Sequence, residues 1–107
     1  MRSRSESDLL FLGAFVDLKL SGFIEVKIKK YNAELLRLYL KPEYTHMKIG
    51  KSLLSETEKI MKVRGVSKCV LYVHSQNHVG ISFYCKNGFK VKDIDGSDFL
   101  MEKKYEL

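Results

Sequence analysis

The chain has 107 residues, 45% of them hydrophobic, and its 19 Lys and Arg residues outnumber its 13 acidic residues to give a formal charge of +6. This length suits a single domain covering residues 1–107, and the apolar content excludes disordered and collagen-like classes. We expect the polar residues 1–7 to be flexible. The longest apolar run, residues 9–16, is too short to cross a membrane.

The same counts bear on compartment and partners. No signal peptide is recognisable, because the N-terminal segment carries acidic residues and no small-residue cleavage site follows the apolar run. Cys69 and Cys85 make neither a disulfide framework nor a metal motif, and His74 and His78 lack a third ligand. We therefore expect a cytoplasmic protein with reduced, buried cysteines and no metal. The positive charge suits a small molecule carrying several phosphates, an acidic protein surface or nucleic acid, and charge alone does not distinguish them.

Three strands are predicted in the first forty residues. Residues 9–16 are apolar, residues 23–29 alternate apolar with charged residues, and residues 34–40 are again mostly apolar. The alternation predicts that the first two strands form a hairpin with one buried face. The chain would reverse direction in the turn region of residues 17–22. The third strand is more apolar and is expected to lie nearer the centre of the sheet.

The hydrophobic period changes after Pro42. Apolar residues recur at helical spacing from Ile49 to Met61, and Gly65 stands where a C-terminal glycine cap belongs, so a helix of about four turns is predicted. Residues 69–73 then form a short buried strand. A strand, a helix and a strand joined by a crossover of this length imply parallel pairing.

A second helix and a hairpin complete the chain. Asn77 is a helix cap for a segment that runs to Lys86 and closes at Gly88. Residues 89–94 and 99–105 are predicted to be strands joined by a tight turn. The order is therefore β-β-β-α-β-α-β-β, an α/β (α+β) fold with a mixed central sheet that has antiparallel arms on a parallel centre.

The segment between the third strand and the first helix carries the richest chemical signal. A strand ends, a tight loop follows and a helix begins near Gly50, so unpaired backbone N–H groups would point out of the loop at the positive end of the helix dipole. That geometry binds phosphate, and Lys48 and Lys51 add charge. The segment on its own is equally typical of a simple strand-to-helix connector.

Residues 44–54 resemble the acetyl-CoA pyrophosphate loop of the GNAT superfamily of N-acetyltransferases. The signature of that loop is Arg or Gln, two residues, Gly, one residue, then Gly or Ala. Gly50 matches the last position, whereas Thr45 stands at the Arg or Gln position and Lys48 at the first Gly.

A second segment, residues 73–89, resembles the family's pattern of Asn, two residues, a small residue, three residues, Tyr, two or three residues and Gly-Phe. The residues that match it are Asn77, Gly80, Tyr84, Gly88 and Phe89. The resemblance covers about residues 8–106 and implies the GNAT-like acyl-CoA N-acyltransferase fold in a short form. The family's opening strand and its two acceptor-side helices are not recognisable, so we expect an open acceptor groove, a covering subunit or a truncated domain. An exposed sheet edge would favour a homodimer or a large partner.

The resemblance implies an acetyl-CoA-dependent N-acetyltransferase that moves the acetyl group by direct attack of an amine on the thioester. The acceptor could be a small molecule or a protein, and neither membrane nor nucleic acid is implied. The alternative is a non-catalytic CoA-binding or protein-interaction module with a degenerate pyrophosphate loop, because Thr45 and Lys48 replace signature residues.

Roles carry over residue by residue. Tyr84 matches the tyrosine that protonates the departing thiolate, although a core aromatic is the alternative reading. Glu34 matches the position of a general base in the family, and the alternative is that it is only a solvent-exposed acid at the end of a strand. His74 is the other candidate for the base. Acetyl-CoA itself would be held by the third strand, the loop and the second helix. The residues expected to bind it are Leu38, Tyr39, Leu40, Thr45, His46, Met47, Lys48, Ile49, Gly50, Lys51, Ser52, Asn77 and Tyr84.

Overall fold

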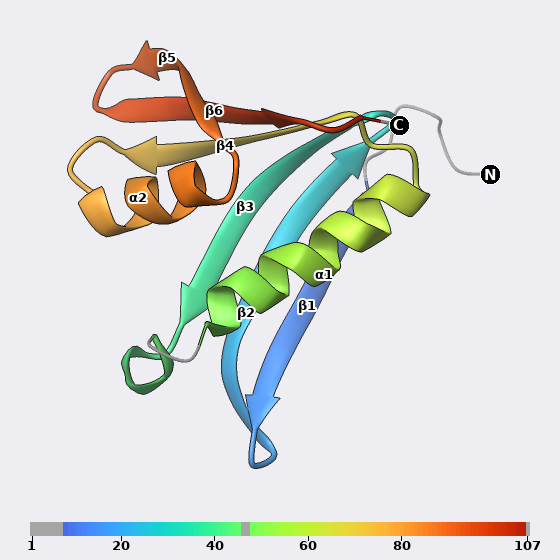
Figure 1. Ribbon diagram of the computed structural model, residues 1–107, viewed down its shortest axis with the longest axis vertical. Helices are drawn as coiled ribbons and strands as arrows, with labels where there is room; N and C mark the ends of the chain where they lie inside the picture. The colour runs from blue at the N-terminus through green and yellow to red at the C-terminus, as the bar shows by residue number, and fades with distance from the viewer. Residues whose placement is uncertain (1–7, 46–47, 107) are drawn as a thin grey trace.

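The computed structural model describes residues 8–45 and 48–106 (Figure 1). The predicted order of strands and helices is confirmed, with a short 3-10 turn at Pro42–Tyr44 added after the third strand. The elements are β1 (Asp8–Val16), β2 (Lys19–Lys29), β3 (Asn32–Leu40), α1 (Ile49–Val63), β4 (Lys68–His74), α2 (His78–Lys86), β5 (Lys90–Asp95) and β6 (Asp98–Lys104). None of the helices in these described ranges is long and apolar enough to span a membrane.

The six strands form one mixed sheet in the order β1-β2-β3-β4-β6-β5. The strands β1, β2 and β3 pair antiparallel and with α1 make what we call the long arm, whereas β4, β6 and β5 with α2 make the short arm. The arms meet at what we call the seam, where β3 and β4 run parallel as predicted. Only three residue pairs form it, Asn32 with Lys68, Ala33 with Cys69 and Glu34 with Val70. Beyond them β3 and β4 diverge, as Figure 1 shows.

A single hydrophobic core lies between the sheet and the two helices. Every second residue of β2 and β4 is buried, which is the period-two pattern of strands with one covered face. The helix α1 contributes buried residues at helical spacing. The best-buried large side chains come from both arms, and they are Phe89, Ile24, Leu54, Met61, Leu71 and Met101. One core therefore holds both arms to the same helical layer.

The first hairpin is tighter than the sequence predicted. Its turn consists of Asp17 and Leu18 alone, with φ of 50° and 66°, and β2 begins at Lys19 rather than at Phe23. Two consecutive left-handed residues make the turn that best suits a two-residue hairpin. Asp17 suits such a turn, but Leu18 is not the Gly that usually follows it. Gly22, placed in the turn by the sequence, lies buried inside β2. A Cβ there would come within 2.6 Å of the Tyr39 carbonyl oxygen, so the glycine permits close approach to β3.

The other predicted boundaries agree within two residues, and one prediction about the cysteines is wrong. The cap of α2 is confirmed, since the Asn77 side-chain oxygen accepts from the Gly80 N–H at 3.0 Å. Cys69 is buried as expected, but Cys85 is exposed, because it lies on the side of α2 that faces away from the core.

Candidate functional site

The seam leaves one edge of β3 open. Parallel pairing ends at Glu34, so in the described chain the backbone of residues 35–40 on the β4 side has no strand partner. The pairing of β2 with β3 also shifts register, with Arg37 opposite Glu25 and Leu35 opposite Val26. Leu36 is the extra residue of this bulge, and a bulge re-aims backbone groups at the point where a ladder is interrupted. The opening therefore presents unpaired backbone donors and acceptors between the two arms.

A pocket of about 400 Å³ lies beside this opening, at the start of α1. The first intrahelical hydrogen bond runs from the Ser52 N–H to the Lys48 carbonyl at 3.1 Å. The amides of residues 49–51 therefore have no partner within the helix, and they stand at its positive end. The residues that line the pocket are Leu40, Thr45, Lys48, Gly50, Lys51, Phe83, Lys86 and Asn87. Three lysines and a helix N-terminus give this pocket the kinds of group that bind phosphate in proteins.

Gly50 brings three elements together at the pocket. It is buried in the first turn of α1. A Cβ at this position would lie 3.3 Å from the Leu40 side chain and 3.4 Å from the Phe83 ring. The signature glycine thus lets α1 approach β3 and α2 closely, which closes the floor of the pocket.

Lys48 has a backbone conformation that glycine adopts without strain. Its φ is 57° and its ψ is 23°, in the left-handed region where a non-glycine residue is strained. The Lys48 side chain is exposed at the pocket, so the residue keeps its charge available there at the cost of this strain.

The structure brings some predicted cofactor residues to this pocket and leaves others outside it. Leu40, Thr45, Lys48, Gly50 and Lys51 line it. Other predicted residues face elsewhere. Leu38 and Ile49 pack on the core, and the Tyr39 ring is tilted against the Phe23 ring with centroids 5.6 Å apart. Ser52 lines a different pocket against β1, and Asn77 caps α2. His46 and Met47 lie outside the described residues.

Sequence reasoning missed the α2 side of the pocket. Phe83, Lys86 and Asn87 line it, although only Tyr84 and Asn77 had been singled out on that helix. The signal was available in part, because Phe83 and Asn87 lie one helical turn apart and so share a face with Gly80. Which face would meet α1 depended on the crossing of the two helices, and no local pattern specifies that.

Tyr84 lies on the inner side of α2. Its ring makes edge contacts with Phe83 at 5.5 Å and with Phe89 at 5.8 Å. Burial raises the pKa of the Tyr84 phenol above its ordinary value, with a smaller contribution from Cys69. The phenol is therefore held neutral at physiological pH, as a proton donor must be.

The two candidate bases lie on the opposite face of the sheet. Glu34 occupies the last parallel pair of the seam, and its side chain is 3.8 Å from Lys27 on the uncovered face. His74 ends β4 on the same face, where its Nδ1 accepts from the Gln76 N–H at 3.1 Å. The opening therefore has Tyr84 on its helix side and Glu34 on its outer side.

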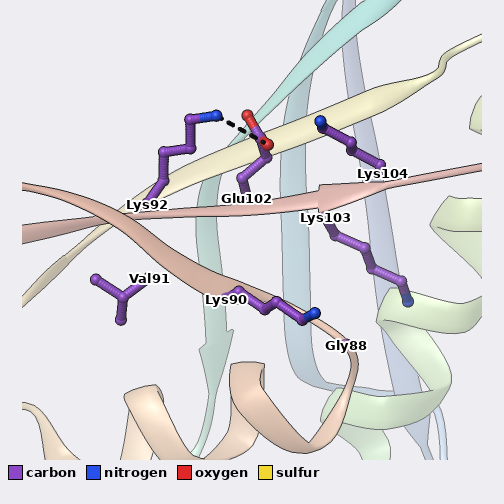
Figure 2. Close-up of a pocket in the computed structure, with 7 residues that line it drawn as sticks. All are labelled: Gly88, Lys90, Val91, Lys92, Glu102, Lys103 and Lys104. Carbon is purple, nitrogen blue, oxygen red and sulfur yellow. Dashed lines mark ion pairs between the residues drawn. The ribbon is translucent and has the colours of Figure 1, made fainter.

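A larger pocket of about 480 Å³ lies on the short arm and does not belong to this site (Figure 2). Glu102 pairs loosely with Lys68 at 3.9 Å and with Lys92 at 3.7 Å, whereas the Lys103 side chain runs away from Glu102 toward α1. The described residues that line this pocket include no helix N-terminus. Within residues 8–45 and 48–106, no three His, Cys, Asp or Glu side chains come together in a way that could hold a metal ion.

Comparison with known proteins agrees with this geometry. The family model described as the acetyltransferase (GNAT) family matches residues 2–89. A spermidine N(1)-acetyltransferase from Thermoplasma acidophilum is 71% identical over 106 residues, which are 99% of this chain and 66% of that protein. A crystal structure of PaiA N-acetyltransferase from Thermoplasma acidophilum, in complex with coenzyme A, superposes with a TM-score of 0.90 at 72% identity, over 92% of this chain and 62% of that one.

More distant structures share the fold. An acetyltransferase from Bacillus cereus superposes with a TM-score of 0.85 at 21% identity, over 94% of this chain and 76% of that one. The chain spans slightly less than two thirds of the two Thermoplasma acidophilum relatives. Since the family model matches well over half of the residues, the chain belongs to the acetyltransferase (GNAT) family.

Proposed function

We propose that this chain is an acetyl-CoA-dependent N-acetyltransferase whose acceptor is a polyamine. The observation that carries the proposal is the opening between β3 and β4, which has the lysine-lined pocket beside it on the helix side. A thioester placed in this opening would be reached by the phenol from one face of the sheet and by an amine from the other.

The pocket suits the diphosphate of coenzyme A. The free amides at the start of α1 would bind phosphate oxygens, and Lys48, Lys51 and Lys86 would neutralise their charge. The open edge of β3 would pair with the amides of the pantetheine arm, much as an added strand pairs with a sheet edge. The 72% identical PaiA structure in complex with coenzyme A supports this assignment.

The chemistry then divides between the two faces. The neutral amine nitrogen attacks the thioester carbonyl carbon, the C–S bond breaks, and the acetyl group passes to nitrogen while the thiolate leaves. Tyr84 donates its phenolic proton to that thiolate. Glu34, directly or through water, takes a proton from the attacking amine, because it stands at the end of the seam on the outer face.

A polyamine acceptor is supported by the 71% identical spermidine N(1)-acetyltransferase. Glu34 also offers a carboxylate where a cationic amine would enter the opening. A protein amine or an unrelated small amine would enter by the same route, and the assay separates them.

The test combines binding with turnover. Calorimetry with CoA should show one site per chain, and the acetyl-CoA assay should release thiol with spermidine but not with a lysine-containing peptide. The absence of CoA binding would overturn the proposal. CoA binding without transfer to any amine would favour the non-catalytic module, and transfer to the peptide alone would replace the polyamine.

A homodimer remains a prediction. Leu9, Phe11 and Phe15 of β1 are each more than half exposed on the uncovered face of the long arm, which a second copy would cover. Sedimentation at several concentrations tests this, and a monomer throughout would exclude it.

A further inference from the structure

Lys103 joins the two helices that form the walls of the candidate site. It lies on β6 opposite Cys69, and its side chain runs toward α1, as Figure 2 shows. Its ammonium is 2.8 Å from the Glu58 carboxylate on α1 and donates to the Asn87 carbonyl at the end of α2 at 2.7 Å. The helix α1 lies over the long arm and α2 lies beside the short arm (Figure 1). The Lys103 ammonium therefore links the helix of one arm to the helix of the other.

The surroundings of Lys103 make this contact specific. Its side chain is 24% exposed, and its ammonium lies 5.5 Å from the Tyr105 ring and 6.0 Å from the Phe89 ring. The Tyr105 hydroxyl donates to the same Glu58 carboxylate at 2.6 Å. Glu58 is therefore held by two donors and presents its charge to Lys103 in a partly desolvated setting, where such pairs are stronger than at the surface.

Gly88 leaves the space that Lys103 occupies. It has φ of +95°, and a Cβ there would lie 3.1 Å from the Lys103 Cε. A larger residue would push the lysine stem away from the Asn87 carbonyl. The glycine that closes α2 therefore also admits the side chain that anchors the end of that helix.

The anchored turn belongs to the pocket. The Asn87 side chain donates to the Phe83 carbonyl at 2.8 Å, and the Phe89 N–H donates to the Tyr84 carbonyl at 3.0 Å. Phe83 and Asn87 line the pocket at the start of α1, and Tyr84 lies between them in sequence. A shift of the Asn87 carbonyl would therefore move a pocket wall and the ring of Tyr84 together.

We propose that Lys103 is a positioning residue for acetyl transfer, which holds the last turn of α2 against α1 through Asn87 and Glu58. This inference rests on the proposed function for its effect on turnover. Its effect on the last turn of α2 is independent of any ligand.

The experiment compares Lys103→Met with Lys104→Met. Both remove one positive charge at neighbouring positions, but Lys104 is exposed and points to the opposite face of β6 (Figure 2). Lys103→Met should raise the CoA dissociation constant about threefold to tenfold and lower kcat roughly tenfold to a hundredfold at a temperature where it is fully folded. Lys104→Met should leave both quantities unchanged.

Hydrogen exchange separates this inference from the proposed function. In the free protein, Lys103→Met should speed exchange of the amides of residues 87–89 and leave those in the middle of α1 as they are in the wild type. If the wild type failed to bind CoA, this readout would still decide the inference. If Lys103→Met failed to fold, Lys103→Arg and Glu58→Gln would replace it, with Arg expected to restore kcat because it can donate to both partners. Exchange and CoA affinity equal to those of Lys104→Met would overturn the proposal.

Discussion

The two arms of the sheet differ in how their strands are paired and covered. In the long arm, β1, β2 and β3 have nine to eleven residues each, and α1 lies across them. In the short arm β5 has six residues, all exposed, and α2 has no fully buried residue. The arms share one core but only three parallel residue pairs. The shared core therefore joins the two arms, whereas the candidate site lies where the arms stop pairing.

The largest expected effect tests whether the arms unfold together. Phe89 belongs to the short arm, is 2% exposed and packs in the shared core. Phe89→Ala should lower the free energy of unfolding by about 3–5 kcal/mol. Urea denaturation followed by circular dichroism should still show one transition.

Val63→Ala is the control, because Val63 is 89% exposed at the end of α1 and lies outside the proposed dimer face. Its effect should stay within about 0.5 kcal/mol. A second transition in Phe89→Ala, with the long arm still folded, would show that the arms are separate units.

Cys69, which pairs with Ala33 at the seam, makes the free energy of unfolding depend on alkaline pH. Burial raises the pKa of the Cys69 thiol from 9.0 to about 12. Below pH 9 the thiol is protonated in both states and its contribution to stability is complete. Above pH 9 the unfolded chain loses the thiol proton first, so the contribution of this thiol to stability falls by about 1.4 kcal/mol per pH unit until about pH 12.

Cys69→Ala should therefore flatten this part of the stability curve relative to wild type. The measurement is urea denaturation at pH 8, 9, 10 and 11, with each variant compared with itself at pH 8. Parallel curves for the two proteins would show that the thiol is not protected at the seam.

The short arm's contribution to chemistry is tested at Tyr84. Tyr84→Phe keeps the ring contacts with Phe83 and Phe89 and removes only the hydroxyl. The rate of acetyl transfer should fall about a hundredfold, whereas CoA affinity should be unchanged and stability should change by about 1 kcal/mol or less. An unchanged kcat, with chemistry shown to limit the rate, would remove Tyr84 from the mechanism.

The long arm's contribution is tested at Lys51, in the first turn of α1. Lys51→Glu places a carboxylate among the lysines of the pocket that we propose for CoA, and it should weaken CoA binding by roughly 1–3 kcal/mol. Lys29→Glu makes the same change of net charge at an exposed position of β2, so it should leave the dissociation constant unchanged. Equal losses in the two variants would mean that only overall charge matters.

The smallest effect concerns the strain at Lys48. Lys48→Gly should stabilise the fold by about 1 kcal/mol, because glycine adopts a φ of 57° freely. Lys30→Gly, at a φ of 56° in the turn between β2 and β3, should stabilise similarly without touching the pocket. CoA affinity should fall slightly in Lys48→Gly alone, since it loses a pocket lysine. A marked rise in affinity would identify the loop as degenerate.

Local patterns predicted much of this molecule. The strand and helix order, the Asn77 cap of α2 and the position of the phosphate loop each depend on residues within one or two turns of one another. Such signals can be read along the chain, because capping and hydrophobic period are local properties. The turn at Asp17 and Leu18 was predicted too broadly, because Leu18 is not the glycine that usually completes a turn with left-handed residues.

The sequence by itself therefore determined the family, the order of elements and the segment that we propose binds phosphate. Only the tertiary structure decided where β3 and β4 part, that Lys86 and Asn87 complete the pocket, and that Tyr84 and Glu34 lie on opposite faces of the opening. It also decided that Lys103 reaches both helices. These relations join residues far apart in the chain, so they depend on strand register and helix crossing, which the packing of one shared core imposes.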